Sequence, residues 1–237
     1  METKLLGVLG GVGPLATVYF TDMIIRNTDA GCDQDHVPML IFNHSTIPDR
    51  TEYILDHSKP NPLPVMVEDA KLLEKAGCDY IVIPCNTAHY FYDEIQNAVS
   101  VPIINIIKET VSFVLRTNPY ARKIGIMATR GTIETDTYKR ECDRHGVECI
   151  KPEAADQNEL MNIIYNQVKA GKPVDTIRFM SIIQNLKNRG CDAVILGCTE
   201  LSIINRDIHL DRPDVVDSME VLSRAAITRC GKKLSER

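Results

Sequence analysis

Short apolar runs alternate with longer amphipathic segments along this chain of 237 residues. Runs rich in β-branched residues, at 80–83 and 193–196, predict buried strands. Segments 15–27, 62–76, 87–99 and 176–188 carry apolar residues at the spacing of helices. Because strand and helix alternate, we expect mostly parallel sheets that are covered by helices on both faces. The predicted fold class is therefore α/β.

One stretch of this pattern occurs twice. The tripeptide Gly-Cys-Asp precedes an apolar run at residues 77–79 and again at residues 190–192. In each copy a second cysteine follows the first after seven residues, at Cys85 and at Cys198. Two thiols are thus presented at matching positions of a repeated unit.

Another pair of matching segments lies well upstream of the cysteines, where residues 124–131 repeat the glycine-containing pattern of residues 6–13. The repeat therefore spans whole domains. We expect two pseudo-symmetric domains, the first of residues 1–106 plus 210–237 and the second of residues 107–209. Their strand ends would meet at one cleft, which would hold the active site.

The second cysteine of each copy lies where a strand ends and a helical segment begins. Backbone N–H groups and the helix dipole favour an anion there, so we expect the Cys85 and Cys198 thiols to ionise readily. The first cysteine of each copy, Cys78 or Cys191, begins a strand, where packing explains a small apolar side chain. In the expected cleft, Cys85 and Cys198 would face each other.

Composition narrows the possible partners. The formal net charge of −5 argues against a nucleic-acid or anionic-membrane surface as the main partner. No apolar run approaches the roughly 18 residues that cross a membrane, and the first residues lack the pattern of a signal peptide, so we expect a cytoplasmic protein. The eight cysteines are then expected to be reduced thiols. Without a Cys-x-x-Cys or His-Glu-x-x-His spacing, we expect no metal site. Because no lysine lies in a recognisable Schiff-base setting, we expect no PLP or other cofactor either.

Two further motifs have competing interpretations. The glycine-rich segment 10–14 formally begins a dinucleotide-binding fingerprint, but the next strand ends in Asn43-His44 and lacks the acidic residue that this site needs. A nucleotide site is therefore the weaker interpretation. Arg50 carries a planar fork that suits a carboxylate, although spacing alone favours a solvated loop arginine.

Paired thiols suit one kind of chemistry. An amino acid is inverted when one base removes its α-proton and an acid returns a proton to the opposite face. A thiol, with a reference pKa of about 8.5, is able to act as base or as acid near neutrality. The carbanion also needs hydrogen-bond donors at the substrate carboxylate. Backbone N–H groups after each cysteine are suited to this, as are the hydroxyls of Thr87, Thr129, Thr132 and Thr199.

Four motifs together resemble the aspartate/glutamate racemase family, and within it the aspartate racemases most closely. They are residues 10–17, 47–51, 84–89 and 197–200, and the resemblance covers essentially the whole chain. The resemblance implies a PLP-independent, two-base racemase of two α/β domains, usually a homodimer. It also implies that Cys85 and Cys198 are the proton donor and acceptor pair.

The resemblance further implies a set of substrate-binding residues for a small dicarboxylic amino acid. They are Asp49, Arg50, Thr51, Asn86, Thr87 and Ala88, with Lys169 near the substrate carboxylate, and to them we add Thr129, Thr132, Thr199 and Glu200. Val12 departs from the family pattern, in which Met is common at this position. Aspartate and glutamate stay open as substrates, since one methylene is worth only about 1–3 kcal/mol in a pocket.

Alternatives to a racemase are a maleate isomerase-like enzyme with one nucleophilic cysteine and a non-catalytic amino-acid sensor. The presence of both thiols and of the Asp-Arg-Thr loop favours the racemase. His89 is either a packed histidine or a group that orients the thiol. Glu200 either stabilises a helix start or keeps Cys198 partly protonated, because a nearby carboxylate raises the pKa of a thiol.

Overall fold

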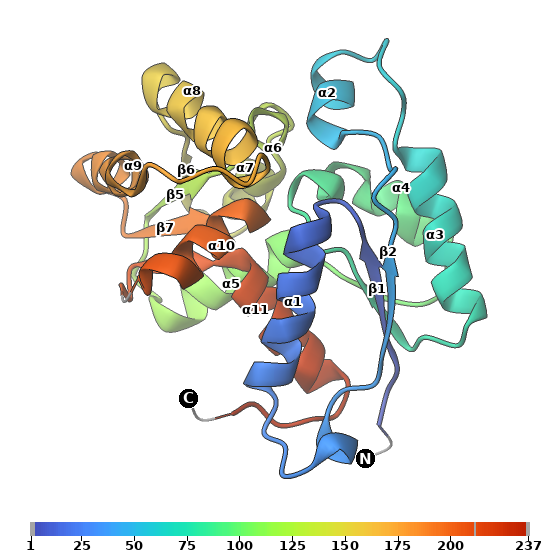
Figure 1. Ribbon diagram of the computed structural model, residues 1–237. Helices are drawn as coiled ribbons and strands as arrows, with labels where there is room; N and C mark the ends of the chain where they lie inside the picture. Colours follow the sequence, from blue (N-terminus) through green and yellow to red (C-terminus); the bar gives the residue numbers. More distant parts are fainter. Residues whose placement is uncertain (1–2, 211, 236–237) are drawn as a thin grey trace. The chain divides into compact units, whose positions relative to one another are not determined.

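The computed structural model describes residues 3–210 and 212–235 (Figure 1). The chain divides into two compact units, Met1–Ile106 with Met219–Arg237 and Ile107–Ser218. Each unit contains a four-stranded sheet in which neighbouring strands run parallel. The predicted α/β class, with two mostly parallel sheets flanked by helices, is confirmed.

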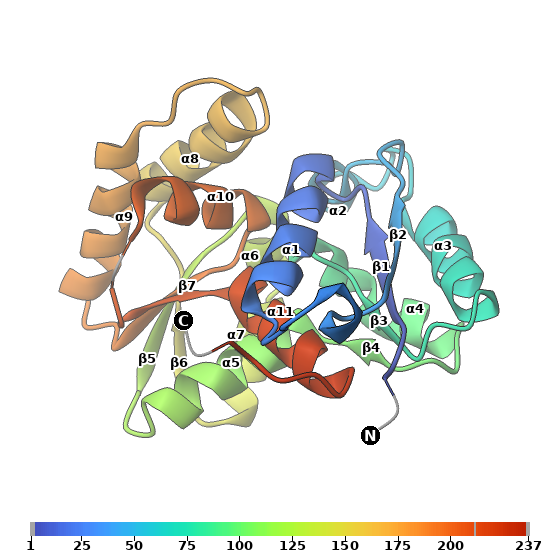
Figure 2. The ribbon, with the colours of Figure 1, turned by 60° about the horizontal axis from the view of Figure 1, so that its bottom comes forward.

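The first unit contains a sheet with the strand order β2-β1-β3-β4. Its strands are β1 (Leu6–Gly10), β2 (Met39–Asn43), β3 (Tyr80–Val82) and β4 (Ile103–Ile104). Its helices are α1 (Pro14–Asn27), η1 (Asp33–Asp35), α2 (Arg50–Leu55), α3 (Leu63–Lys75), η2 (Thr87–Phe91), α4 (Tyr92–Asn97) and α11 (Ser218–Arg229). Helices α1 and α11 lie on one face of the sheet, and α3 and α4 lie on the other (Figures 1 and 2).

The second unit repeats this topology with the strand order β6-β5-β7-β8. Its strands are β5 (Lys123–Met127), β6 (Glu148–Ile150), β7 (Ala193–Leu196) and β8 (Val215–Asp217). Its helices are α5 (Ile106–Thr117), α6 (Arg130–Glu134), α7 (Thr137–Arg144), α8 (Ala154–Asn162), the π-helix η3 (Ile163–Val168), α9 (Thr176–Asn188) and α10 (Thr199–Ile208). Equal strand orders make β3 and β7, which precede the two cysteines, equivalent strands.

The last strand of each sheet is followed by a helix that belongs largely to the other unit. After β4 the chain enters α5, which lies mostly in the second unit, and after β8 it enters α11, which returns to the first. We expected the return at residue 210. The structure has it at Met219, because β8 pairs with β7 and so stays with the second unit.

The repeated Gly-Cys-Asp tripeptide serves the fold in both copies. Gly77 and Gly190 follow helices with φ values of 86° and 84°, a conformation that glycine adopts without strain. The cysteine of the tripeptide, Cys78 or Cys191, packs against a glycine of the central strand. A Cβ atom on Gly7 would lie 3.0 Å from the Cys78 sulfur, and one on Gly125 would lie 3.2 Å from the Cys191 sulfur.

The aspartate of each tripeptide binds the backbone at the start of the central strand. Asp79 accepts a hydrogen bond from the Leu5 amide at 2.8 Å, and Asp192 accepts two, from Arg122 and Lys123, at 2.7 and 2.9 Å. The tripeptide therefore fixes the strand that leads to the second cysteine. Cys78 and Cys191 are packing residues, as their sequence context predicts.

Two local predictions were wrong or incomplete. We expected one helix over residues 87–99, but the chain forms the 3-10 helix η2 and then a separate short helix, α4. The apolar pattern also failed to predict β6, a three-residue strand at the edge of its sheet.

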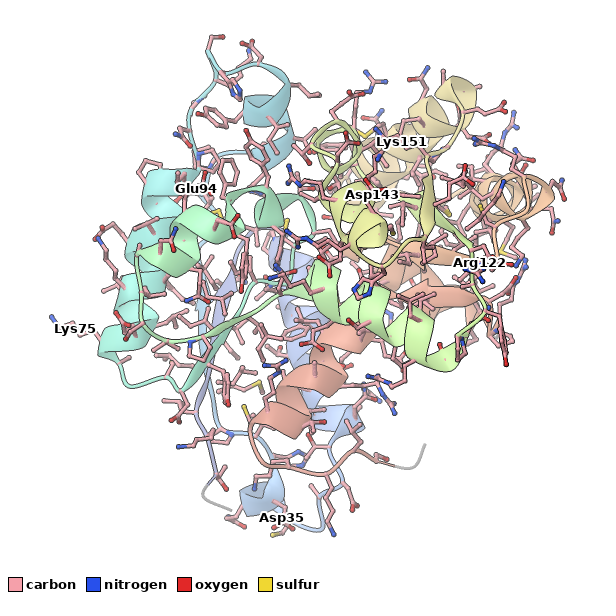
Figure 3. The ribbon with its side chains drawn as sticks, turned by 180° about the vertical axis from the view of Figure 1, so that it is seen from behind. Asp35, Lys75, Glu94, Arg122, Asp143 and Lys151 are labelled. Atoms are coloured by element: carbon pink, nitrogen blue, oxygen red, sulfur yellow. The ribbon has the colours of Figure 1, made fainter. Side chains whose placement is uncertain are left out.

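Charged side chains such as those of Lys75, Glu94 and Arg122 lie on the exposed surface (Figure 3).

Candidate active site

Both second cysteines lie just beyond the carboxyl ends of equivalent strands. Cys85 follows β3 and Cys198 follows β7. Only 7% of Cys85 and 5% of Cys198 is exposed. In parallel sheets this edge is where ligands bind, so each unit presents one nearly buried thiol at a position suited to a small molecule.

The Cys85 segment is held by apolar packing and by two backbone contacts. Cys85 belongs to a hydrophobic cluster that includes Met66, Ala88 and Phe91. Its amide donates to the Ile83 carbonyl at 2.7 Å. Its own carbonyl lies 2.8 Å from Nδ1 of the buried His89. These contacts fix the backbone on both sides of the thiol.

The helix that we expected to begin at Cys85 begins one residue later and is short. Asn86, not Cys85, is the N-cap residue, and η2 is a 3-10 helix of five residues. A short helix has few aligned peptide dipoles, so it offers the thiolate little stabilisation. At Cys198 the predicted helix start is present, because this residue is itself the N-cap of the ten-residue helix α10.

A carboxylate lies directly beside the Cys198 thiol. The thiol donates to Glu200, with 3.0 Å between Sγ and Oε2. Burial raises the pKa of Cys198 well above its usual range, and the charge and hydrogen bond of Glu200 raise that pKa further. The positive charge of Lys169 acts in the opposite direction. The structure therefore favours the protonated thiol at Cys198, so the expectation that this thiol ionises readily was wrong: burial and the Glu200 carboxylate outweigh the helix start.

Lys169 belongs to the same cluster, although it is distant in sequence. It follows the π-helix η3, which packs against α10. Its Nζ lies 4.0 Å from Oε1 of Glu200 and 4.2 Å from the centroid of the Tyr165 ring. The Thr199 hydroxyl also approaches Glu200, at 3.4 Å. One carboxylate thus connects a thiol, a hydroxyl and an ammonium group.

The two predicted threonines of the second unit lie at the same sheet edge. The Gly197 amide donates to the Met127 carbonyl at 2.7 Å, which aligns the segment before Cys198 with the end of β5. Thr129 caps α6 by accepting from the Thr132 amide at 3.2 Å, and the two hydroxyl oxygens are also 3.2 Å apart. Both residues are buried.

In the first unit the Asp-Arg-Thr segment is built into α2. Asp49 caps this helix by accepting from the Glu52 amide at 3.0 Å. Arg50 is only 6% exposed, so the interpretation as a solvated loop arginine was wrong. Its guanidinium donates to the carbonyls of Ile47 and Pro48 at 3.4 and 3.1 Å. Its Nε is buried and has no hydrogen-bond partner among the described residues.

The structure brings the remaining predicted residues of the first unit close to this arginine. Helix α2 packs against η2, the turn that follows Cys85. Thr51, Asn86, Thr87 and Ala88 are all buried. The first unit therefore gathers seven predicted residues, Cys85 included, on two adjoining segments, and the second gathers five around Cys198.

Sequence analysis missed a histidine–aspartate pair beside these segments. Nδ1 of His44, at the end of β2, lies 2.9 Å from Oδ2 of Asp69, a buried residue of α3. Burial raises the pKa of Asp69, and the hydrogen bond from His44 opposes that shift. A carboxylate on the otherwise apolar face of α3 was the signal available in the sequence.

The glycine-rich segment after β1 is explained by close backbone packing. Gly11 has a φ of 81°, and a Cβ atom there would lie 2.2 Å from the His44 backbone. The residues that the structure describes contain no group of three or more His, Cys, Asp or Glu side chains placed to hold a metal ion. None of the described helices is both long enough and apolar enough to span a membrane.

Comparison with known proteins identifies relatives of the whole chain. The family model for Asp/Glu/Hydantoin racemase matches residues 9–226. The chain is similar to the broad specificity amino-acid racemase RacX of Bacillus subtilis (strain 168), with 30% identity over 94% of this chain and 97% of the relative.

Solved structures agree with this match. The aspartate racemase of Picrophilus torridus superposes with a TM-score of 0.81 at 30% identity, covering 98% of this chain and 96% of the other. An aspartate racemase homologue from Pyrococcus horikoshii OT3 has a TM-score of 0.75 at 25% identity, covering 96% and 99%. The resemblance predicted from the four motifs is confirmed. The chain belongs to the Asp/Glu/Hydantoin racemase family.

Proposed function

We propose that this protein interconverts the enantiomers of an acidic amino acid, with aspartate as the main substrate, by proton transfer at Cys85 and Cys198. As a member of its family the chain is an amino-acid racemase, which is an isomerase. One observation carries the mechanism: two nearly buried thiols follow equivalent strands of two sheets with the same strand order. Racemisation needs one proton-transfer group on each face of the α-carbon, and each copy supplies one thiol.

In this mechanism the two cysteines act on a single substrate molecule. A thiolate removes the α-proton, and the electron pair of the broken C–H bond moves onto the substrate carboxylate. The other cysteine, as a thiol, then gives its proton to the opposite face of the α-carbon. The first cysteine ends as a thiol and the second as a thiolate, so the next turnover runs in the reverse sense or follows proton exchange with water.

The surroundings of Cys198 support a defined starting state. The Glu200 carboxylate accepts the hydrogen bond of this thiol and disfavours its ionisation. At the equivalent position after Cys85 the chain has Thr87, which carries no charge. In our proposal Cys198 therefore starts as the acid and Cys85 as the base.

Arg50 supports an acidic side chain on the substrate. A buried guanidinium N–H without a partner is costly, and a carboxylate oxygen would satisfy it. Aspartate is our choice because of the Picrophilus torridus enzyme, at 30% identity. The Bacillus subtilis relative, which has broad specificity, makes a panel of amino acids part of any test.

The proposal distinguishes this protein from an isomerase with a nucleophilic cysteine and from an amino-acid sensor. The test is incubation of the protein with L-aspartate in deuterated water, followed by proton NMR and optical rotation. A racemase exchanges the α-proton while the rotation decays to zero. Conversion of maleate without such exchange would favour the isomerase, and binding without any exchange would favour the sensor.

We further propose a homodimer in a reducing compartment, the cytoplasm. Large apolar side chains are exposed on the first unit: Leu15, Val18 and Ile25 on α1, and Leu40, Ile41 and Phe42 on the edge strand β2. Such a face suits a second copy of the chain. All eight cysteines are free thiols, in keeping with a reducing environment. Light scattering would test the dimer, and substitution of Leu15 and Val18 by Lys should give monomers.

A further inference from the structure

His89, whose role the sequence left open, is held by two backbone groups of opposite character. It is only 5% exposed and lies four residues after Cys85. Its Nδ1 is 2.8 Å from the Cys85 carbonyl oxygen, and its Nε2 accepts the Ile106 amide at 3.2 Å. A backbone amide only donates and a carbonyl only accepts. The ring must therefore carry its proton on Nδ1 and leave Nε2 unprotonated.

His89 is therefore an uncharged ring that bridges two backbone groups. Both ring nitrogens are used in these hydrogen bonds, so neither is left to bond the Cys85 thiol. Burial lowers the pKa of His89 from 6.5 to about 4, and hydrogen bonding to the backbone at Cys85 and Ile104 opposes that shift. The ring also stacks on Tyr92, with centroids 5.9 Å apart and an angle of 11° between planes. The Tyr92 hydroxyl donates to the Ile103 carbonyl at 3.1 Å. The ring thus joins the cysteine turn to the first residue of α5 and, through Tyr92, to β4.

The residue that His89 reaches is where the chain leaves the first unit. Ile106 is the last residue of that unit and the first residue of α5, which continues into the second. Through this ring, the backbone of Cys85 is tied to the crossing between units.

The second copy makes the same connection with different side chains. Aligning Cys198 with Cys85 places Ser202 at the position of His89 and Asn205 at the position of Tyr92. Ser202 donates to Oδ1 of Asp217 at 2.6 Å, and Asn205 donates to Oδ2 at 3.0 Å. Asp217 is the last residue of β8, immediately before α11.

A further contact completes this second connection. The Ser218 hydroxyl donates to the Leu196 carbonyl at 2.7 Å, two residues before Cys198. Ser218 is the last residue of the second unit and the first of α11, which returns to the first. Each thiol segment is therefore fastened to the point where its own unit ends.

We propose that His89 and Asp217 are positioning residues, each of which holds one thiol-bearing segment against a crossing between the units. The inference rests on the proposed racemase function. Reacting groups need close placement, and an error of about 1 Å costs roughly 100-fold in rate. His89 acts in this scheme as an uncharged hydrogen-bond bridge for Cys85, and Asp217 anchors the segment of Cys198.

The test uses proteins with a single active thiol, so that each position is examined alone. In the Cys198→Ser protein, deuterium exchange into the α-position of aspartate depends on Cys85. There His89→Leu should lower exchange by about 10- to 100-fold, whereas His89→Gln, which keeps one donor and one acceptor, should stay within about 3-fold. In the Cys85→Ser protein, His89→Leu should change exchange by less than about 3-fold. Asp217→Leu should lower exchange by about 10- to 100-fold in the Cys85→Ser protein and change it by less than about 3-fold in the Cys198→Ser protein.

Two results would overturn the inference. One is equal loss in both backgrounds, which indicates general damage to the fold, and the other is a Gln variant as slow as the Leu variant. Should the Leu variant fail to fold, nitrogen NMR of the wild-type protein decides: a proton on Nδ1 of neutral His89 between pH 6 and 8 supports the bridge, and an Nε2–H or imidazolium form refutes it. A wild-type protein that exchanges no amino acid would instead refute the proposed function, while the NMR result would still decide the state of His89.

Discussion

Replacing Glu200 with Gln should make Cys198 a far better nucleophile. Glutamine keeps an oxygen acceptor near the thiol but removes the negative charge that lies 3.0 Å from Sγ. Two unit charges at this separation interact by about 5.5 kcal/mol at an effective dielectric constant near 20. Lys169, 4.0 Å from the other carboxylate oxygen, already offsets part of that repulsion. A net effect of about 1–3 kcal/mol remains, and roughly 1.4 kcal/mol corresponds to a factor of ten in the thiolate fraction.

The direction follows from the charge. The carboxylate raises the pKa of Cys198, so its removal lowers that pKa and increases the thiolate fraction at any pH below it. In the Cys85→Ser protein, Cys198 should then react with iodoacetamide about 10- to 100-fold faster at pH 7, with the cysteine identified by mass spectrometry. Glu68→Gln, an exposed residue of α3, is the matched control and should leave the rate unchanged. An unchanged or slower reaction in the Glu200 variant would refute the account of this thiol.

Three further predictions follow from the same geometry. Arg50→Ala should lower kcat/KM for aspartate by about 10- to 100-fold, since a charge-assisted bond to a carboxylate is worth about 1.5–3 kcal/mol; unchanged kinetics would remove Arg50 from the substrate site. Because the pKa of folded His89 is lowered to about 4, the unfolded chain binds the extra proton first as the pH falls. The contribution of neutral His89 to the free energy of unfolding is therefore fully present above pH 6.5. This free energy falls by about 3 kcal/mol as the pH is lowered from 6.5 to 4. Urea unfolding at pH 7 and pH 4.5 should reveal this loss in the wild type and a smaller one in His89→Gln. Hydroxylamine and chelators should leave racemisation intact, and loss of activity in folded protein would contradict a mechanism based on two thiols alone.

Features written in short stretches of sequence were predicted well. The strand before Cys85 and the strand before Cys198 are both formed, because each is a β-branched apolar run that follows a glycine helix end. Local patterns do not specify partners, however. Val215–Asp217 reads as a strand, yet only its pairing with β7 places it in the second unit.

Tertiary packing explains what local patterns do not predict. Lys169 reads as a solvated charge at a helix end, but the packing of η3 on α10 places it near Glu200. Arg50 reads as a loop residue, but its guanidinium is buried against carbonyls of the preceding turn. The expected helix over residues 87–99 is interrupted where His89 bonds to the start of α5 and Tyr92 bonds to β4. No local periodicity encodes such contacts.

The central claim is that Cys85 and Cys198 serve opposite faces of one α-carbon, and the most direct measurement is α-deuterium exchange by the two single Cys→Ser variants. Serine is far too weak an acid to replace a thiol, so racemisation should fall by several orders of magnitude in both. Each variant should still exchange the α-proton of one enantiomer of aspartate in deuterated water, and the two variants should prefer opposite enantiomers. If either variant racemises aspartate at the wild-type rate, or if both exchange the same enantiomer, the two-thiol mechanism is wrong.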